Sequence, residues 1–457
     1  MTADEAIRYI ESHGLSREKK GLDNEKKLLK LLGDPEKKLR YIHVAGSNGK
    51  GSTCAMFASI LKECGYKTGL FISPHLIRYN ERISINGQDI PDNELSLAMD
   101  RVKEAEEEMG VALSQFEILT AAAFLYFAKE SCDIAVLEVG MGGEYDPTNV
   151  IDAPLLSVIT NIGLEHTKYL GNTLSEIAHT KAGIIKEGSP CICYDALDKE
   201  VLEVIEKICE DRKAPLTVAD HSQIEPVSES FNGQIFKWRG ETYEIPLVGE
   251  YQLHNVATVL TGMEILAESG VRINTETGAG TCESTDTDSG ASYIDTETGR
   301  DIRITTAAIR EGLKKVHWPA RMEILSTDPL FILDGGHNPQ CMKALSESLR
   351  KLVPGKDIVF LIGVLQDKDY PEMAAEILPI AKGFVCVTPD SDRSVNADTL
   401  SEYLKSKNVT AVSEKSIKEA VRTAVKMAGV GGCIVALGSL YLAGEIRREA
   451  EELSECF

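Results

Sequence analysis

The chain has 457 residues, of which 43% are hydrophobic, and its formal net charge is −22. This length allows two or three domains with sizeable cores, whereas the acidity argues against binding nucleic acid or an anionic membrane through the protein's general field. No run of about 18 apolar residues occurs, so we expect no membrane span. Residues 1–10 are too polar for a signal peptide. The 11 cysteines form no CxxC pair, which favours reduced thiols and a cytoplasmic location.

Between residue 40 and about residue 190, apolar runs alternate with helical patterns. We predict strands at 41–45, 68–72, 134–139 and 155–160, and helices at 52–63 and 119–129. Continuous rather than alternating apolar strands are typical of a parallel sheet covered by helices on both faces. Thr173 and Glu176 have the spacing of a capping box, which predicts a helix that begins there and carries Lys181.

The pattern changes after residue 215. Hairpin turns at 231–233 and 239–241 predict a small β region, and a helical pattern returns at 255–268. Residues 273–301 are rich in Thr, Ser, Gly and acids and nearly lack large aliphatic residues, so we predict a mobile surface loop. An acidic metal-binding loop is an alternative there, although calcium loops need a stricter ligand spacing.

A second alternating β/α block begins near residue 318. Its predicted strands are 331–333, 359–362, 384–387 and 434–437, with helical patterns between them. This block predicts a second, Rossmann-like domain. Because Pro319 would interrupt a helix, we place the boundary there and expect domains at 1–316 and 317–457.

Residues 43–54, HVAGSNGKGSTC, have the order of a phosphate-binding loop, in which a strand leads through a glycine-rich turn into a helix. Only two residues separate the first two glycines, whereas the common P-loop has four. The loop residues are Gly46, Ser47, Asn48, Gly49, Lys50, Gly51 and Ser52. Glycines let the backbone approach phosphate oxygens, and the lysine supplies a cation for the β- and γ-phosphates. The alternative is a glycine-rich turn with an exposed lysine.

Polar residues follow four of the predicted strands: Lys50, Ser73, Glu138 and His166. The carboxyl ends of parallel strands share one edge of a sheet, so we expect these side chains to lie together in a ligand crevice. A Mg²⁺ ion accompanying a nucleotide would compensate the buried Glu138 carboxylate. In the alternative, a lysine or the backbone satisfies Glu138, and His166 is an ordinary loop residue.

In the second block, Asp334 and His337 follow a predicted strand in the segment DGGHNP. A carboxylate and an imidazole at a strand's carboxyl end can hold a ribose or a phosphate. The alternative, that Asp334 caps the next helix, fits the spacing nearly as well.

The chain resembles the folylpolyglutamate synthase/dihydrofolate synthase family of the Mur ligase superfamily over nearly its whole length. The matching motifs are HVAGSNGKGS (43–52), SPHLIRYNERI (73–83), LEVGMGGEYDPTNV (137–150), LEHTKYLG (164–171), HTKAGIIK (179–186), GEYQLHNVATVL (249–260), HWPAR (317–321), DGGHNP (334–339) and GSLYLAGEIR (438–447). Departures are modest, since Ser47, Ala320 and Gly336 replace a more usual Thr, Gly and Ala. None of them removes a reactive group.

The resemblance implies an α/β fold with an N-terminal Mur-ligase-type P-loop ATPase domain, built on a mostly parallel sheet with a small β subregion, and a C-terminal Rossmann-like α/β domain. ATP would bind between the two. The implied ATP contacts are Gly46, Asn48, Gly49, Lys50, Gly51, Ser52, Asn255, Arg321, Asp334 and His337. The implied Mg²⁺ ligands are Ser73, Glu138 and His166.

The resemblance also implies the activity, an ATP-dependent addition of L-glutamate to the carboxylate of a folate or of dihydropteroate through an acyl phosphate. Lys50, Lys181 and His337 would be catalytic, and Lys181 matches a lysine that is carbamylated in the family. The implied glutamate and pterin contacts are Pro74, His75, Arg82 and Ser439. We expect a monomer that binds neither nucleic acid nor membrane. The alternatives are another Mur-type amide ligase with a different acceptor, or a nucleotide-binding protein without turnover.

Overall fold

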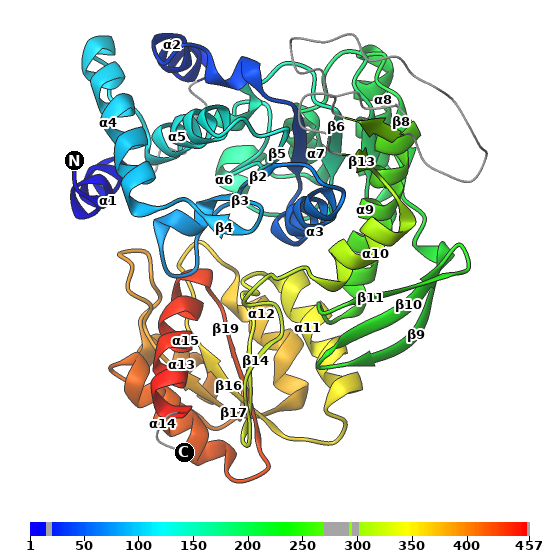
Figure 1. The fold of residues 1–457 in the computed structure, drawn as a ribbon. Coiled ribbons are helices and arrows are strands. Elements are labelled where there is room, and N and C mark those ends of the chain that lie inside the picture. Colours follow the sequence, from blue (N-terminus) through cyan, green and yellow to red (C-terminus); the bar gives the residue numbers. More distant parts are fainter. Residues whose placement is uncertain (15–20, 269–291, 295–300, 455–457) are drawn as a thin grey trace.

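The computed structural model describes residues 1–14, 21–268, 292–294 and 301–454. Two α/β units lie one above the other in Figure 1, and a small antiparallel sheet extends along one side. No helix in these described ranges is long and apolar enough to cross a membrane. The nine cysteines that the structure describes are free thiols.

The N-terminal unit is built on an eight-stranded sheet with the order β4-β3-β2-β5-β1-β6-β7-β8. The strands β2, β5, β1, β6, β7 and β8 pair in parallel, and β3 and β4 add an antiparallel edge. Their bounds are β1 (Tyr41–Ala45), β2 (Thr68–Phe71), β3 (Ile83–Ile85), β4 (Gln88–Asp89), β5 (Ile134–Glu138), β6 (Leu156–Ile159), β7 (Cys191–Cys193) and β8 (Leu216–Val218).

Helices cover both faces of this sheet. They are α1 (Ala3–Ser12), α2 (Asp23–Leu31), α3 (Lys50–Glu63), α4 (Asp92–Met109), α5 (Gln115–Lys129), α6 (Thr167–Leu170), α7 (Leu174–Ala182), α8 (Lys199–Asp211), α9 (Glu250–Glu268) and α10 (Thr306–Lys314). Alternate residues of β5 enter different cores: Val136 packs with α3 and α9, and Leu137 packs with α4 and α5. A strand buried on both faces needs apolar side chains at every position, which explains the continuous apolar runs.

The predicted small β region is an antiparallel sheet of β9 (Ile224–Ser230), β10 (Gly233–Trp238) and β11 (Glu241–Ile245). The inner face of this sheet packs in the core that includes α3, α9 and α10, through the side chains of Phe236, Trp238 and Tyr243. Of the predicted loop at 273–301, most lies outside the described residues. The described parts, β12 (Ser292–Ile294) and β13 (Asp301–Arg303), form an antiparallel pair.

The C-terminal unit contains a six-stranded sheet with the order β14-β15-β19-β16-β17-β18, in which only β14 is antiparallel. The strands are β14 (Glu323–Thr327), β15 (Leu330–Leu333), β16 (Ile358–Ile362), β17 (Ala381–Cys386), β18 (Ala411–Ser413) and β19 (Cys433–Leu437). The helices are α11 (Pro339–Leu352), α12 (Tyr370–Ile377), α13 (Ala397–Lys405), α14 (Ile417–Ala428) and α15 (Leu440–Ser454). The α/β fold class is therefore confirmed. The chain passes from one sheet to the other between α10 and β14.

Gly312 marks a close crossing of α10 over α3. A Cβ built at Gly312 would lie 2.4 Å from Ile60 Cα and 2.8 Å from Ile60 N, and these backbone atoms cannot swing aside. Replacing glycine by alanine inside a helix usually stabilises by roughly 0.5–1 kcal/mol. Here we expect Gly312→Ala to lower the free energy of unfolding by about 1–3 kcal/mol through overpacking.

Urea unfolding followed by circular dichroism measures this change. Ala307→Gly, at an exposed position of the same helix, gives the ordinary alanine–glycine difference as a control. A Gly312→Ala protein at least as stable as the parent would contradict the close crossing.

Candidate active site

The sheet order brings four predicted site residues to one edge. Strands β2, β5, β1 and β6 are neighbours in that order. Ser73, Lys50 and His166 follow β2, β1 and β6, and Glu138 is the last residue of β5. All four line a cavity of about 290 Å³.

The phosphate loop connects β1 to α3. Its glycine positions are too closely packed to hold a side chain. A Cβ at Gly46 would lie 1.8 Å from Thr160 Oγ1, and one at Gly49 would lie 2.6 Å from Asn255 Oδ1. Gly49 also has a positive φ of 86°, which glycine adopts without strain, and it is the N-cap of α3. The backbone N–H groups of a helix start favour anions, and Lys50 Nζ bends back to the carbonyl of Gly46 at 3.1 Å.

Glu138 is a buried carboxylate at the end of β5. Its Oε2 accepts the backbone N–H of Ser73 at 3.0 Å, so the backbone satisfies one oxygen, as the alternative interpretation expects. Burial raises the pKa of Glu138, and the positive charges of Lys50 and Arg321 oppose this effect. The carboxylate thus lies near cations and next to the backbone of Ser73, whose hydroxyl would complete an oxygen donor set that suits Mg²⁺.

The next segment adds His166 and a residue that the sequence analysis did not single out, Glu165. Burial lowers the pKa of His166 to about 4, so its imidazole is neutral at neutral pH and has a lone pair for a metal. Glu165 Oε1 accepts from Lys181 Nζ at 2.7 Å, and the same Nζ donates to the carbonyl of Gly46 at 2.7 Å. The signal for Glu165 in the sequence is its place beside His166 in the LEHT motif.

Lys181 is buried, with 1% of its surface exposed. Its helix α7 begins with the predicted capping box, because Thr173 accepts from the Glu176 backbone and Glu176 from the Thr173 backbone. Burial lowers the pKa of Lys181. Burial raises the pKa of Glu165, but the attraction of Lys181, Lys50 and His166 together outweighs it and brings the pKa to about 2. Lys181 and Gly46 lie beneath the cavity rather than on its lining.

The C-terminal unit closes the other side of this cavity. Asp334 accepts backbone N–H groups from Met322 at 3.0 Å and Gly336 at 2.7 Å, and burial raises its pKa. It does not cap α11, because Asn338 does so by accepting from the Cys341 backbone at 2.9 Å. The alternative interpretation of Asp334 was therefore wrong.

The two units touch at the phosphate loop itself. Asn48 Oδ1 accepts from Asn338 Nδ2 at 2.8 Å, and Asn48 Nδ2 donates to Gln340 Oε1 at 2.9 Å. Next along the loop, a Cβ at Gly51 would lie 2.3 Å from the Trp318 ring. The loop that is built to meet a phosphate is thus also a contact between the units.

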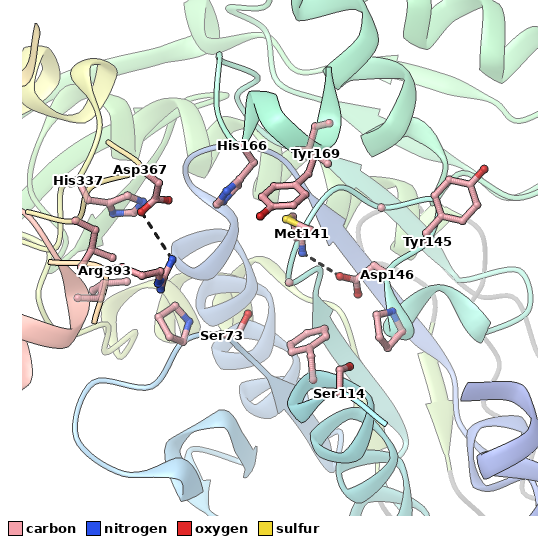
Figure 2. A pocket seen from close by; sticks show the side chains of 18 of the residues that line it. Ser73, Ser114, Met141, Tyr145, Asp146, His166, Tyr169, His337, Asp367 and Arg393 are labelled. Atoms are coloured by element: carbon pink, nitrogen blue, oxygen red, sulfur yellow. Dashed lines mark hydrogen bonds and ion pairs between the residues drawn. The ribbon is translucent and has the colours of Figure 1, made fainter. Parts of the chain in front are cut away.

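A second cavity of about 300 Å³ adjoins the first, and Ser73, Pro74, His166 and His337 line both. Figure 2 shows Ser114, Tyr145 and Asp146 toward one end of it, and His337, Asp367 and Arg393 toward the other. The first group belongs to the N-terminal unit and the second to the C-terminal unit. Burial raises the pKa of Asp146 to about 6.

Most of the residues predicted to contact substrates line this second cavity. Pro74, Arg82 and Ser439 do so, whereas His75 lies outside the lining. The His75 Nδ1 accepts from Arg82 Nε at 2.8 Å, so it orients the buried guanidinium. The predicted nucleotide contacts line the first cavity, except Gly46: Asn48, Gly49, Lys50, Gly51, Ser52, Asn255, Arg321, Asp334 and His337.

Two family models match the chain: the Mur ligase middle domain at residues 44–262 and the Mur ligase, glutamate ligase domain at 320–440. The dihydrofolate synthase/folylpolyglutamate synthase of Bacillus subtilis is 34% identical over 448 residues, which are 94% of this chain and 95% of that protein. The folylpolyglutamate synthase of Lacticaseibacillus casei is 32% identical over 98% of both chains.

Solved structures are similar over the same length. The folylpolyglutamate synthase of Mycobacterium tuberculosis, complexed with ADP and AMPPCP, has a TM-score of 0.81 at 27% identity and covers 98% of this chain and 97% of its own. A folylpolyglutamate synthase complex with AMPPCP and folate has a TM-score of 0.79 at 30% identity and covers 99% of this chain and all of its own.

The buried Lys181–Glu165 pair predicts a particular dependence of stability on pH. Because the pKa of Glu165 lies below its ordinary value of 4.5, at about 2, the pair stabilises the fold above about pH 4.5 and this contribution is lost as the pH falls toward 2. Lys181→Met leaves a buried carboxylate without its cation, which costs about 3–5 kcal/mol at neutral pH. We expect this deficit to shrink on acidification, since Glu165 can then be protonated.

Urea unfolding at about pH 7 and about pH 4 measures the deficit at each pH. Lys186→Met is the control, because Lys186 Nζ donates to the Asn149 carbonyl at 3.0 Å rather than to a carboxylate. A Lys181→Met deficit that stays constant with pH would contradict the ion pair.

Proposed function

This chain belongs to the folylpolyglutamate synthase/dihydrofolate synthase family of Mur ligases, and we infer that it is an ATP-dependent ligase that joins L-glutamate to the carboxylate of a folate or of dihydropteroate. The observation that carries this inference is the pair of adjoining cavities. One contains the phosphate loop, the other has apolar and polar walls suited to an extended acceptor, and they meet at Ser73, Pro74, His166 and His337.

ATP in the first cavity would place its phosphates on the loop and its γ-phosphate where the cavities meet. We propose that the loop residues and Asn255, Arg321, Asp334 and His337 hold the nucleotide. Ser73, Glu138 and His166 would hold Mg²⁺, which when bound supplies charge neutralisation for the phosphates. The similar synthase of Mycobacterium tuberculosis was solved in complex with ADP and AMPPCP, which supports nucleotide binding by this fold.

The reaction follows from this placement. An acceptor carboxylate oxygen attacks the γ-phosphorus of ATP, and the bond between the γ-phosphorus and the bridging oxygen of the β-phosphate breaks. The products of this step are ADP and an acyl phosphate on the acceptor. The glutamate amine, having lost a proton, attacks the acyl carbon, and phosphate departs as the amide forms. The protein contributes mainly position and positive charge, in which Lys50 is the loop's cation. Closure of the two units excludes the water that would hydrolyse the acyl phosphate.

The second cavity has chemically different ends. Asp146, at the end lined by the N-terminal unit, can accept hydrogen bonds from ring N–H groups of a pterin. Lys368 and Arg393, toward the opposite end, lie 3.9 Å and 3.7 Å from Asp367 oxygens and can attract the carboxylates of the incoming glutamate. We propose this orientation, in which the acceptor carboxylate lies between the pterin and the amino acid.

Carbamylation of Lys181 belongs to the same proposal as a second state of this side chain, which would replace the ammonium that pairs with Glu165. Its lowered pKa favours the neutral amine that reacts with carbon dioxide. A carbamate here would face Glu165 as a second negative group and would need a cation between them. A cytoplasmic location and a monomeric state stay predictions from the sequence.

Mass spectrometry of products tests the function directly. The enzyme is incubated with Mg-ATP and L-glutamate, and dihydropteroate and tetrahydrofolate are offered in parallel. Addition of one glutamate to dihydropteroate shows synthase activity, and a ladder on the folate shows chain extension. Neither product with ATP left intact would mean that the acceptor is wrong, because the acceptor carboxylate must attack before ATP is consumed, and other pterin or Mur-type carboxylates are then offered. ATP left intact with those acceptors as well would support a nucleotide-binding protein without turnover.

Lys50→Ala is expected to lower kcat by at least about 100-fold, because it removes the loop's cation for the transferring phosphoryl group. Product formation under saturating substrates measures the effect. Lys62→Ala, an exposed lysine at the other end of α3, is the matched control and should keep its activity. Comparable turnover in both variants would contradict the role of the loop.

Glu138→Gln preserves the shape of the side chain and an acceptor for the Ser73 N–H but removes the charge. We expect the Mg²⁺ concentration for half-maximal activity to rise by about tenfold or more. Glu36→Gln, which changes a buried carboxylate outside both cavities, should leave the Mg²⁺ titration unchanged. An unchanged titration in Glu138→Gln would remove Glu138 from the metal site.

A further inference from the structure

Three potential metal ligands from separate segments converge outside both cavities. Asp195 follows β7, His221 begins the short 3-10 helix η4 (His221–Gln223), and His254 lies in α9. One ligand atom from each lies within 4.8 Å of the others. None of the three lines either cavity described above.

The contacts among them orient the carboxylate and one imidazole. His254 Nδ1 lies 2.8 Å from Asp195 Oδ1, and Asp195 Oδ2 accepts the backbone N–H of His221 at 3.1 Å. The two imidazole rings are stacked, with centroids 3.7 Å apart and planes at 15°. One carboxylate oxygen is therefore held by the backbone, and the other faces the histidines.

One polar atom of the cluster has no partner. His221 Nε2 is buried and makes no hydrogen bond with any described residue. A buried ring nitrogen without a partner costs about 1–3 kcal/mol. The carboxylates of Asp195, Glu250 and Asp220 place negative charge near the same imidazole.

We propose that Asp195, His221 and His254 bind a divalent transition-metal ion of the zinc class. Two imidazoles and one carboxylate form a common zinc ligand set, with solvent in the remaining position. The two nitrogen donors make Mg²⁺, which prefers oxygen, a poor occupant. All three side chains are partly exposed, which leaves an entry path for the ion.

The distances within the cluster need little adjustment to hold the ion, whereas the orientation of the rings must change. A tetrahedral ion with bonds of about 2.1 Å places its ligand atoms about 3.4 Å apart, so the widest separation within the cluster closes by at most about 1.4 Å. The ion must lie near the plane of each imidazole, which requires the stacked rings to rotate apart.

The position of the cluster gives the ion a structural consequence. Tyr194 and Asn255 line the first cavity, and they are the chain neighbours of Asp195 and His254. The Tyr194 ring also packs on His254, with centroids 5.3 Å apart. An ion would join the end of β7, η4 and α9, and would stabilise the folded chain by preferential binding to it.

Titration of the whole protein with Co²⁺, in excess Mg²⁺, tests the site, because the intensity of cobalt's visible absorption distinguishes four or five ligands from six. We expect one equivalent with the strong absorption of a low-coordinate site, its displacement by Zn²⁺, and a rise of the melting temperature with Zn²⁺. His221→Gln should weaken Co²⁺ binding by about tenfold or more. That side chain loses no hydrogen bond at Nε2.

Asp195→Asn serves as a second variant and should weaken binding similarly. His179→Ala, which removes an exposed histidine from α7, is the control and should bind as the parent does. Equal Co²⁺ affinity in the parent and in a folded His221→Gln or Asp195→Asn protein would overturn the proposal, as would binding only with the weak absorption of a six-coordinate ion. In that case the cluster is a hydrogen-bonded and stacked contact.

Discussion

The Lys181 ammonium, buried beneath the phosphate loop, is the interaction on which the site depends most. It donates at once to the first carbonyl of the loop and to the Glu165 carboxylate. A charge without solvent must be neutralised by the protein, so the loop and the segment after β6 are fixed with respect to one another. His166 directly follows Glu165, so the same pair also places a predicted metal ligand.

The parallel sheet supplies the remaining order. Its strands β2, β5, β1 and β6 end side by side, and a polar residue at the end of each lines the same cavity. The C-terminal unit repeats this arrangement at the end of β15, where Asp334 and His337 face the same cavity. Residues at two facing sheet edges can therefore bind the nucleotide, the metal ion and the two further substrates that the reaction needs.

Much of this could be predicted from the sequence, because burial on both faces produces continuous apolar strands and because strand ends identify a site. Helix starts were less accurate. The helix α3 begins at Lys50 rather than at residue 52, since Gly51 conceals the start, and α5 begins at Gln115 although Ser114 and Glu117 form a capping box. Glu165 was missed because its partner is 16 residues away in the chain.

The convergence of Asp195, His221 and His254 could not be predicted either. Their spacing in the sequence does not show that the end of β7, η4 and α9 meet in the fold. For the same reason the sequence could not decide whether Asp334 caps α11. Only the position of Asn338, whose side chain takes that role, answers the question.

The contact of Asn48 with Asn338 and Gln340 has a consequence for how the two units communicate. The loop that would hold the phosphates is itself part of the surface between the units, so ligand occupancy and the angle between the units belong to one equilibrium. If nucleotide binding favours the approach of the C-terminal unit, thermodynamic reciprocity requires that a second ligand which favours the same approach tightens the nucleotide by the factor by which the nucleotide tightens that ligand. An amino acid or an acceptor that draws the units together in the second cavity would act on ATP affinity through this contact, without touching the nucleotide.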